Sequence, residues 1–259
     1  MSQLIVMYLM LFVISLLANG LSALAGGGAG LLQLPVLLFL GLEFAPALAT
    51  HKIASVALGV GATYRHMREK NISLNFSLYM LAAGLPGVVL GANVILQVPD
   101  RWAQGVLGCF TLGLGVYSMV SPQLGMSEQD RRRNVLGYLS GALGLFFIGI
   151  LNGSITSGTG LFVTIWLVVW FGLSYKLAVA YTLILVGMFW NGTGALVLAM
   201  QAPVKWDWLP MLILGALAGG YLGAHWSIAK GNKLVKRCFE VLTIVVGLSL
   251  LWRAVCLPQ

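Results

Sequence analysis

Charged residues are scarce in this chain of 259 residues. They make up 8% of the sequence, whereas about a quarter of the residues of a typical soluble domain are charged. Hydrophobic residues make up 59%, and the mean hydropathy is +0.93. This composition excludes a water-soluble core as the main body of the protein.

Cysteine is also rare, and the signatures of catalysis are missing. Cys109, Cys238 and Cys256 are scattered within apolar runs, which excludes a disulfide framework or a cysteine metal cluster and favours a role in packing. The three histidines are isolated, and no HExxH motif occurs. The sequence therefore predicts no catalytic residues, no metal site and no cofactor, and it does not indicate an enzyme.

Long apolar runs are what the chain does contain. A bilayer core about 30 Å thick needs roughly 20 apolar residues per helix, and charge-poor stretches of about that length recur throughout. The net charge of +8 could indicate a nucleic-acid partner, but most Lys and Arg fall in short loops, where membrane topology explains them. We predict an all-α, polytopic protein of the lipid bilayer with no nucleic-acid partner.

The sequence repeats itself at an offset of about 132 residues. Gly87–Ala92 matches Gly219–Ala224, and Asn19-Gly20 corresponds to Asn152-Gly153. Chance matches among many Gly, Ala and Leu are the alternative, but the matches keep their order. Duplication predicts membrane repeat 1 at residues 1–121, a cytoplasmic linker at 122–134 and membrane repeat 2 at 135–259, together one transmembrane domain.

Each repeat divides into about five helical elements. The second element of each has about 12 residues and reaches only about 18 Å, too short to cross the bilayer upright. We therefore expect a broken or re-entrant helix beside a Gly-rich break, where protein or a water-filled cavity surrounds the backbone. The expected elements are 4–24, 31–41, 47–65, 75–97 and 101–121, then 135–151, 161–172, 175–200, 207–229 and 233–256.

The positions of the basic residues predict that the two repeats are inverted. Cytoplasmic loops carry an excess of Lys and Arg. The loop after the third element is basic in the first repeat but not in the second. This loop is therefore predicted to be cytoplasmic in the first repeat and external in the second. Both termini are predicted to lie outside. The cations assigned to the cytoplasm are Arg65, Arg68, Lys70, Arg131, Arg132, Arg133, Lys230, Lys233, Lys236 and Arg237, and those assigned outside are Arg101, Lys205 and Arg253.

The two Gly-rich breaks are the predicted substrate site. Inverted repeats with broken helices near the midplane are typical of secondary transporters. A helix that begins at such a break presents unpaired N–H groups and a positive dipole end, which favour an anion. Close helix packing is the alternative role for these glycines. The predicted site residues are Gly26, Gly27, Gly28 and Gly30 in the first break and Gly158, Thr159 and Gly160 in the second.

Polar residues within the predicted spans are further candidates, because ionisable groups in a membrane are commonly functional. His51 and Lys52 follow Thr50 at the start of the third element, and Lys52 could pair with an anionic substrate. It could equally extend to the interface or pair with Glu43. The neutral candidates, each of which could instead bond a neighbouring helix, are Asn152, Thr156, Ser157, Thr159, Thr182 and Asn191.

The chain resembles the sulfite exporter TauE/SafE family. The resemblance rests on AGGGAGLLQLP at Ala25–Pro35 and PALATHK at Pro46–Lys52. A weaker second copy is NGSITSGTG at Asn152–Gly160, with AVAYT at Ala178–Thr182. The resemblance covers almost the whole chain and implies movement of sulfur-containing anions, such as sulfite or organosulfonates, across the bacterial inner membrane.

Together these features predict a secondary transporter that exports small sulfur-containing anions by alternating access. The alternatives are an anion channel, a membrane-embedded binding protein, or an importer of another small anion. A metal cation as substrate is disfavoured, because the predicted spans lack clustered carboxylate, His or Cys ligands. The particular anion, the direction, a coupling ion and the oligomeric state stay open.

Overall fold

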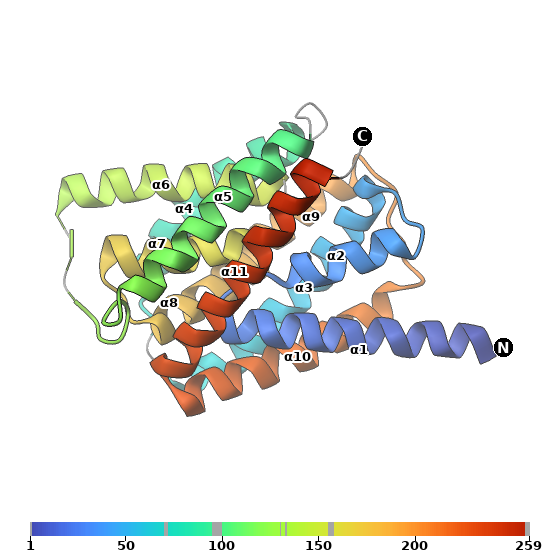
Figure 1. The fold of residues 1–259 in the computed structure, drawn as a ribbon, viewed down its shortest axis with the longest axis horizontal. Helices are drawn as coiled ribbons and strands as arrows, with labels where there is room; N and C mark the ends of the chain where they lie inside the picture. The colour runs from blue at the N-terminus through green and yellow to red at the C-terminus, as the bar shows by residue number, and fades with distance from the viewer. Residues whose placement is uncertain are drawn as a thin grey trace.

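A computed structural model shows a bundle of helices in which the two halves of the chain are interleaved (Figure 1). The structure describes residues 2–69, 72–94, 100–129, 131–132, 134–154 and 158–256. Those parts contain helices and connecting turns and no strand, so the predicted all-α class is confirmed.

The described residues of the first half form five α-helices and one short 3₁₀ turn. Their bounds agree with the predicted elements to within a few residues, except that the fourth element was expected to continue into residues 95–97, which lie outside the described part. The elements are α1 (Ser2–Ala25), α2 (Ala29–Phe39), α3 (Phe44–His66), η1 (Met67–Glu69), α4 (Leu74–Val94) and α5 (Asp100–Val120).

The second half follows the same order of elements. The predicted third element, 175–200, is divided into α8, the π-helical η3 and α9, and the i→i+5 bonding of a π-helix leaves no mark in the hydrophobic pattern. The elements are α6 (Val135–Ser154), α7 (Thr159–Phe171), α8 (Tyr175–Tyr181), η3 (Thr182–Trp190), α9 (Asn191–Ala199), α10 (Leu209–Lys230) and α11 (Asn232–Cys256).

Several helices have the length and composition needed to cross a bilayer. Within the described residues five qualify: Leu4–Ala25, Leu74–Val94, Val135–Ser154, Tyr175–Ala199 and Leu209–Lys230. Their outward faces are apolar. Leu4, Ile5, Val6 and Leu9 of α1 are each more than half exposed. Such a surface suits lipid and not water, and the protein is a multi-pass membrane protein.

Glycines allow helices of opposite halves to pack closely. α1 lies along α10 and α4 lies along α6, while α5 lies along α11. A methyl group on Gly87 would collide with the Phe146 carbonyl oxygen, and one on Gly219 would collide with that of Leu16. These two matched glycines therefore let the backbones of neighbouring helices approach closely.

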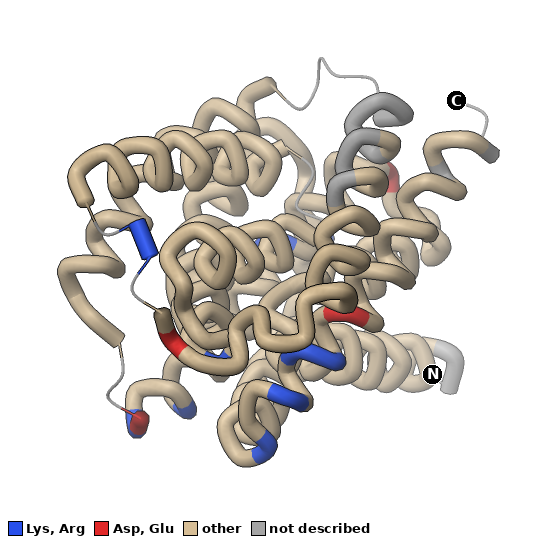
Figure 2. The backbone as a smooth tube through the Cα atoms, turned by 60° about the vertical axis from the view of Figure 1, so that its left-hand side comes forward, with Lys and Arg blue, Asp and Glu red and all other residues tan. Residues whose placement is uncertain are grey.

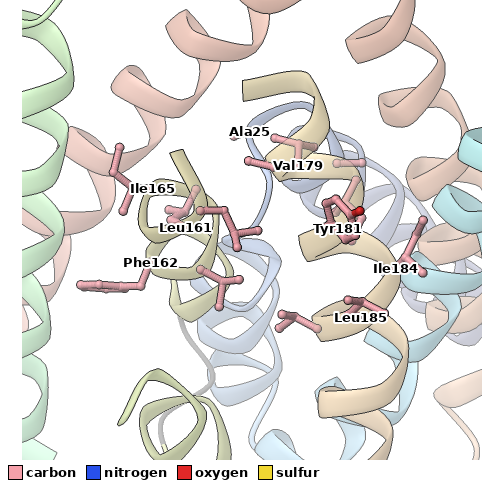
Figure 3. Packing of buried hydrophobic residues seen from close by; sticks show 14 of the residues in the cluster. Ala25, Leu161, Phe162, Ile165, Val179, Tyr181, Ile184 and Leu185 are labelled. Atoms are coloured by element: carbon pink, nitrogen blue, oxygen red, sulfur yellow. The ribbon is translucent and has the colours of Figure 1, made fainter. Parts of the chain in front are cut away.

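The short helix α7 lies inside the bundle. Leu161, Phe162 and Ile165 are buried, and Figure 3 shows them in one apolar cluster with Tyr181 and Leu185 of the neighbouring helical segment. A helix that is apolar on all sides needs such surroundings. Because protein encloses α7, Gly158 at its N-cap can hold a left-handed conformation at membrane depth.

Basic residues gather toward one end of the molecule (Figure 2). Arg65 Nη1 lies 3.1 Å from Glu69 Oε1, and Lys176 Nζ lies 3.7 Å from Glu69 Oε2. The end of α3, η1 and the start of α8 therefore meet there. At the other end of α3, the Thr50 hydroxyl accepts a hydrogen bond of 3.0 Å from Lys205 N. The loops that carry Arg65 and Lys205 thus lie at opposite ends of α3.

Candidate functional site

The two short helices both begin at a glycine in the left-handed region. Gly28, with φ of 98°, precedes α2, and Gly158, with φ of 81°, precedes α7. Only glycine adopts such angles at little cost. Neither residue makes a side-chain cap hydrogen bond. The N-cap residues therefore give the first N–H groups of both helices no side-chain cap, while Leu31 N and Leu161 N bond to Gly28 O and Gly158 O at the same helix starts.

The two breaks are in contact with each other. A methyl group on Gly27 would lie 2.5 Å from Leu161 N and 2.6 Å from Gly160 C. Across the same junction, Thr164 Oγ1 donates a hydrogen bond of 2.9 Å to Gly26 O. Residues more than 130 positions apart in the sequence thus bring the N-termini of α2 and α7 to one place.

A small, partly open cavity of about 40 Å³ lies at this junction. Apolar and polar residues of both halves form its wall. They are Ser22, Gly27, Gly28, Ala29, Gly30, His51, Ser55, Asn152, Thr159, Gly160, Thr182, Leu183, Val186, Gly187 and Asn191.

Neutral side chains join the second break to α3. Asn152 Nδ2 donates to Thr159 Oγ1 at 2.9 Å and to Asn191 Oδ1 at 3.4 Å. Asn191 Nδ2 in turn donates to Ser55 Oγ at 3.2 Å. The structure therefore brings together three residues that the sequence could only name singly. They line the cavity and also bond neighbouring helices.

Lys52 is fully buried, and its ammonium group is held by the end of α6. Lys52 Nζ donates to Asn152 O at 2.7 Å and lies 3.5 Å from Asn152 Oδ1. Asn152 belongs to the last turn of α6, where the helix dipole is negative. Glu43 stands at the N-cap of α3 and is not among the salt bridges that the described residues form. The pairing of Lys52 with Glu43 that the sequence left open is therefore not seen.

Ser22 offers the cavity a hydroxyl that has no hydrogen-bond partner among the described residues. Ser22 is 1% exposed, and Ser22 Oγ is buried. A buried polar atom is normally paired, so an unpaired one in a cavity wall indicates a place for a ligand atom or water. Sequence reasoning missed Ser22 and Ser55. The only available signal was that each lies about one helical turn from a predicted site residue.

The remaining predicted residues lie around the cavity. Gly26 and Gly158 flank it, and Lys52 stands behind Asn152. Thr50 faces away, because its hydroxyl bonds the backbone of the 200–208 loop. Thr156 and Ser157 lie outside the described residues.

The cavity wall carries no carboxylate in the part of the chain that the structure describes. Nor do the described residues contain a group of three His, Cys, Asp or Glu that could hold a metal ion. The site offers uncapped helix N-termini, hydroxyl and amide groups and a nearby cation. This arrangement suits a small anion.

Comparison with known proteins gives a consistent match. A family model described as "Sulfite exporter TauE/SafE" matches residues 11–250. The chain is 27% identical over 242 residues to the probable membrane transporter protein YfcA of Escherichia coli K12, covering 93% of this chain and 88% of that protein. It is likewise 27% identical to the probable membrane transporter protein ORF9 of a Sinorhizobium species, covering 93% and 91%. A probable membrane transporter protein of Haemophilus influenzae is 24% identical over 93% of each chain. No solved structure matches the chain significantly.

Proposed function

Because the chain belongs to the sulfite exporter TauE/SafE family, we propose that it is a secondary transporter of small sulfur-containing anions, such as sulfite or organosulfonates. Its family and relatives make it a membrane transporter of the bacterial inner membrane. The substrate class, the outward direction and alternating access are the proposal. We assign export because the matching family is described as an exporter.

One observation carries the proposal: the uncapped N-termini of α2 and α7 meet at one cavity. Each N-terminus supplies backbone N–H groups and roughly half a positive charge, so both attract negative charge to the same point. Lys52 adds a full positive charge behind Asn152. An oxyanion with several acceptor oxygens fits this donor-rich cavity, and no resident carboxylate in the described wall competes with it.

The arrangement of the helices supports inverted repeats. The third element of the first half ends at His66, and that of the second half ends before Lys205. The loops that follow these elements lie at opposite ends of α3. The packing is also reciprocal, since α1 lies along α10 just as α6 lies along α4. Two halves related in this way can alternate around a fixed site, one opening as the other closes.

The short helices fit the same scheme as parts of re-entrant hairpins. In Figure 1, α2 turns back along α1. α7 likewise follows α6 in the chain, and α2 and α7 begin directly after Gly28 and Gly158. The broken backbone then lies at the cavity, where it can bind substrate without exposure to lipid.

Transport by purified protein in liposomes tests this function. With sulfite and a panel of organosulfonates, we expect flux that saturates with concentration and accelerated exchange when unlabelled anion is present on the opposite side. Flux that neither saturates nor shows exchange would indicate a channel. Absence of flux for every anion in the panel would remove sulfur anions as substrates.

A further inference from the structure

We propose that His51 binds a proton together with the anion, so that each anion crosses the membrane with a proton. The inference rests on the proposed function for its anion and adds the coupling ion. It starts from three buried side chains, Asn19, Gln33 and His51, that lie beside the cavity and are each at most 1% exposed.

The orientation of Asn19 is fixed by its own helix. Asn19 Nδ2 lies 2.7 Å from Ser15 O, and a carbonyl oxygen can only accept a hydrogen bond. The atom at this position must therefore be the amide nitrogen. The same nitrogen lies 3.2 Å from Gln33 Oε1, so Gln33 presents its oxygen to Asn19.

The orientation of Gln33 then fixes the tautomer of His51. His51 Nδ1 lies 3.3 Å from the same oxygen, Gln33 Oε1. Because this oxygen accepts, Nδ1 must carry a hydrogen and donate it. In the neutral ring, Nε2 is consequently the nitrogen with the free lone pair. His51 lines the cavity but Gln33 does not. Because the Nδ1 side of the ring faces Gln33, we infer that the Nε2 side faces the cavity.

Few charged groups surround this imidazole. α1, α2, α6, α7, η3 and α9 contain no Lys, Arg, Asp, Glu or His, and Lys52 is its charged neighbour on α3. Tyr181 of α8 accepts a hydrogen bond from Ser73 N. The other charged groups and histidines in the helices packed against α3, and in α3 itself, are at the basic end of the molecule: Arg65, His66, Arg68, Glu69, Lys176, His225 and Lys230.

An anion in the cavity therefore decides the charge of His51. In the empty site, burial and the ammonium of Lys52 oppose a second positive charge, which keeps the ring neutral. A bound anion reverses the local field and favours a proton on Nε2. Thermodynamic linkage makes the effect reciprocal: protonation of His51 raises the affinity for the anion by the same factor as the bound anion raises the affinity of His51 for the proton. When the anion leaves on the other side, the proton leaves with it.

Proton counting during sulfite transport tests this coupling. We expect wild-type protein in weakly buffered liposomes to move sulfite faster down an imposed proton gradient. In His51→Asn, the amide nitrogen can replace Nδ1 as donor to Gln33, but nothing titrates. This variant should move about one proton fewer per sulfite, and its remaining flux should depend on the gradient less than wild-type flux does. Because protonation of sulfite itself is the same in both experiments, the difference reports the protein.

Two further variants make the result decisive. His225→Asn, at an exposed position near the basic end, is the matched control and should behave as wild type. Gln33→Glu places a carboxylate against Nδ1, which favours the protonated ring, and should shift the pH midpoint of sulfite uptake upward by about one unit or more. This shift can be measured even if His51→Asn does not fold.

Two results would overturn the role of His51 and leave sulfite transport intact. One is an equal number of protons per sulfite in wild type and His51→Asn, and the other is an unchanged pH midpoint of sulfite uptake in Gln33→Glu. Wild-type protein that moves none of the sulfur anions would instead contradict the proposed function.

Discussion

Asn152 is the residue that connects the charged part of the site to its helix termini. Its backbone oxygen accepts from Lys52, and its side chain donates to Thr159 and Asn191. Lys52 therefore influences the cavity in two ways, through its charge and through the position of α7. A buried ammonium without a resident carboxylate is costly, and the negative end of α6 offsets part of this cost in the empty site.

Replacement of Lys52 tests its contribution to anion binding. Lys52→Gln should weaken sulfite binding by about 1–3 kcal/mol, the range for a hydrogen bond to a charged group, and Lys52→Arg should retain part of the affinity. Titration calorimetry on folded, purified protein measures the change. The control is Lys205→Gln, whose partner Asp207 is half exposed, and it should bind normally. Unchanged affinity in Lys52→Gln would leave the helix N-termini as the source of anion selectivity.

Ser22 should matter for the ligand and not for the fold. Ser22→Ala removes a hydroxyl without a partner among the described residues, so sulfite affinity should fall by about 1 kcal/mol, roughly fivefold, while thermal stability is kept. Ser77→Ala is the matched control, because the Ser77 hydroxyl donates to Ser73 O at 2.8 Å outside the cavity. The control should lose some stability and no affinity. Equal sulfite affinity of Ser22→Ala and wild type would exclude Ser22 from the site.

From the sequence, several residues of the cavity wall could be named, but the groups that they bond could not. Glycine clusters and isolated polar residues within apolar runs indicated both breaks, His51 and Asn152. The partner of Lys52 is a backbone oxygen of the other half, and no side-chain pattern can reveal such a contact. Ser22 and Ser55 were missed because single serines are common in membrane helices, where they bond their own backbone.

Among the elements, α2 and α7 are positioned by the contact of their preceding glycines. Gly27→Ala would place a methyl group 2.5 Å from Leu161 N at φ of 149°, so it should abolish sulfite transport and destabilise the protein by several kcal/mol. Gly158→Ala also has positive φ, at 81°, but its methyl group would meet side chains at 3.4 Å or more. It should cost about 1–2 kcal/mol and keep measurable transport.

Melting temperature in detergent and sulfite uptake in liposomes measure both variants. Normal uptake by Gly27→Ala would show that the junction of the two breaks does not form the site. Loss of uptake by Gly158→Ala with an unchanged melting temperature would instead show that this glycine contacts substrate directly.

The helical elements could largely be predicted, because apolar runs, Gly-rich breaks and basic loops mark their ends. The short lengths of α2 and α7 also followed from the sequence. The π-helical stretch Thr182–Trp190 did not, since a uniformly apolar segment has no face whose period could reveal the extra residue per turn. Which helices of opposite halves pack together likewise depends on tertiary contacts and not on local pattern.

For the whole molecule, the proposed inverted arrangement of the repeats predicts the exposure of each loop. In a background without the native cysteines, single cysteines at Arg68, Arg132 and Gly231 should resist an impermeant thiol reagent in intact cells, while one at Asp207 should react. The reason is that Arg68 belongs to the basic end, which the positive-inside rule places in the cytoplasm. Permeabilised cells provide the control, because all four positions should then react. Labelling of positions 68 and 207 from the same side would refute the inverted topology.

We propose that the anion binds where α2 and α7 begin, and a crystal structure with a bound anion would show whether it does. Selenite is a close analogue of sulfite, and the anomalous scattering of selenium identifies its position in a crystal. We predict one dominant selenium peak in the cavity between the first turns of the two short helices, beside Ser22 and within reach of the backbone N–H groups of Gly30 and Gly160. A dominant peak at the basic end of the molecule, with this cavity free of selenium at saturating selenite, would contradict the account.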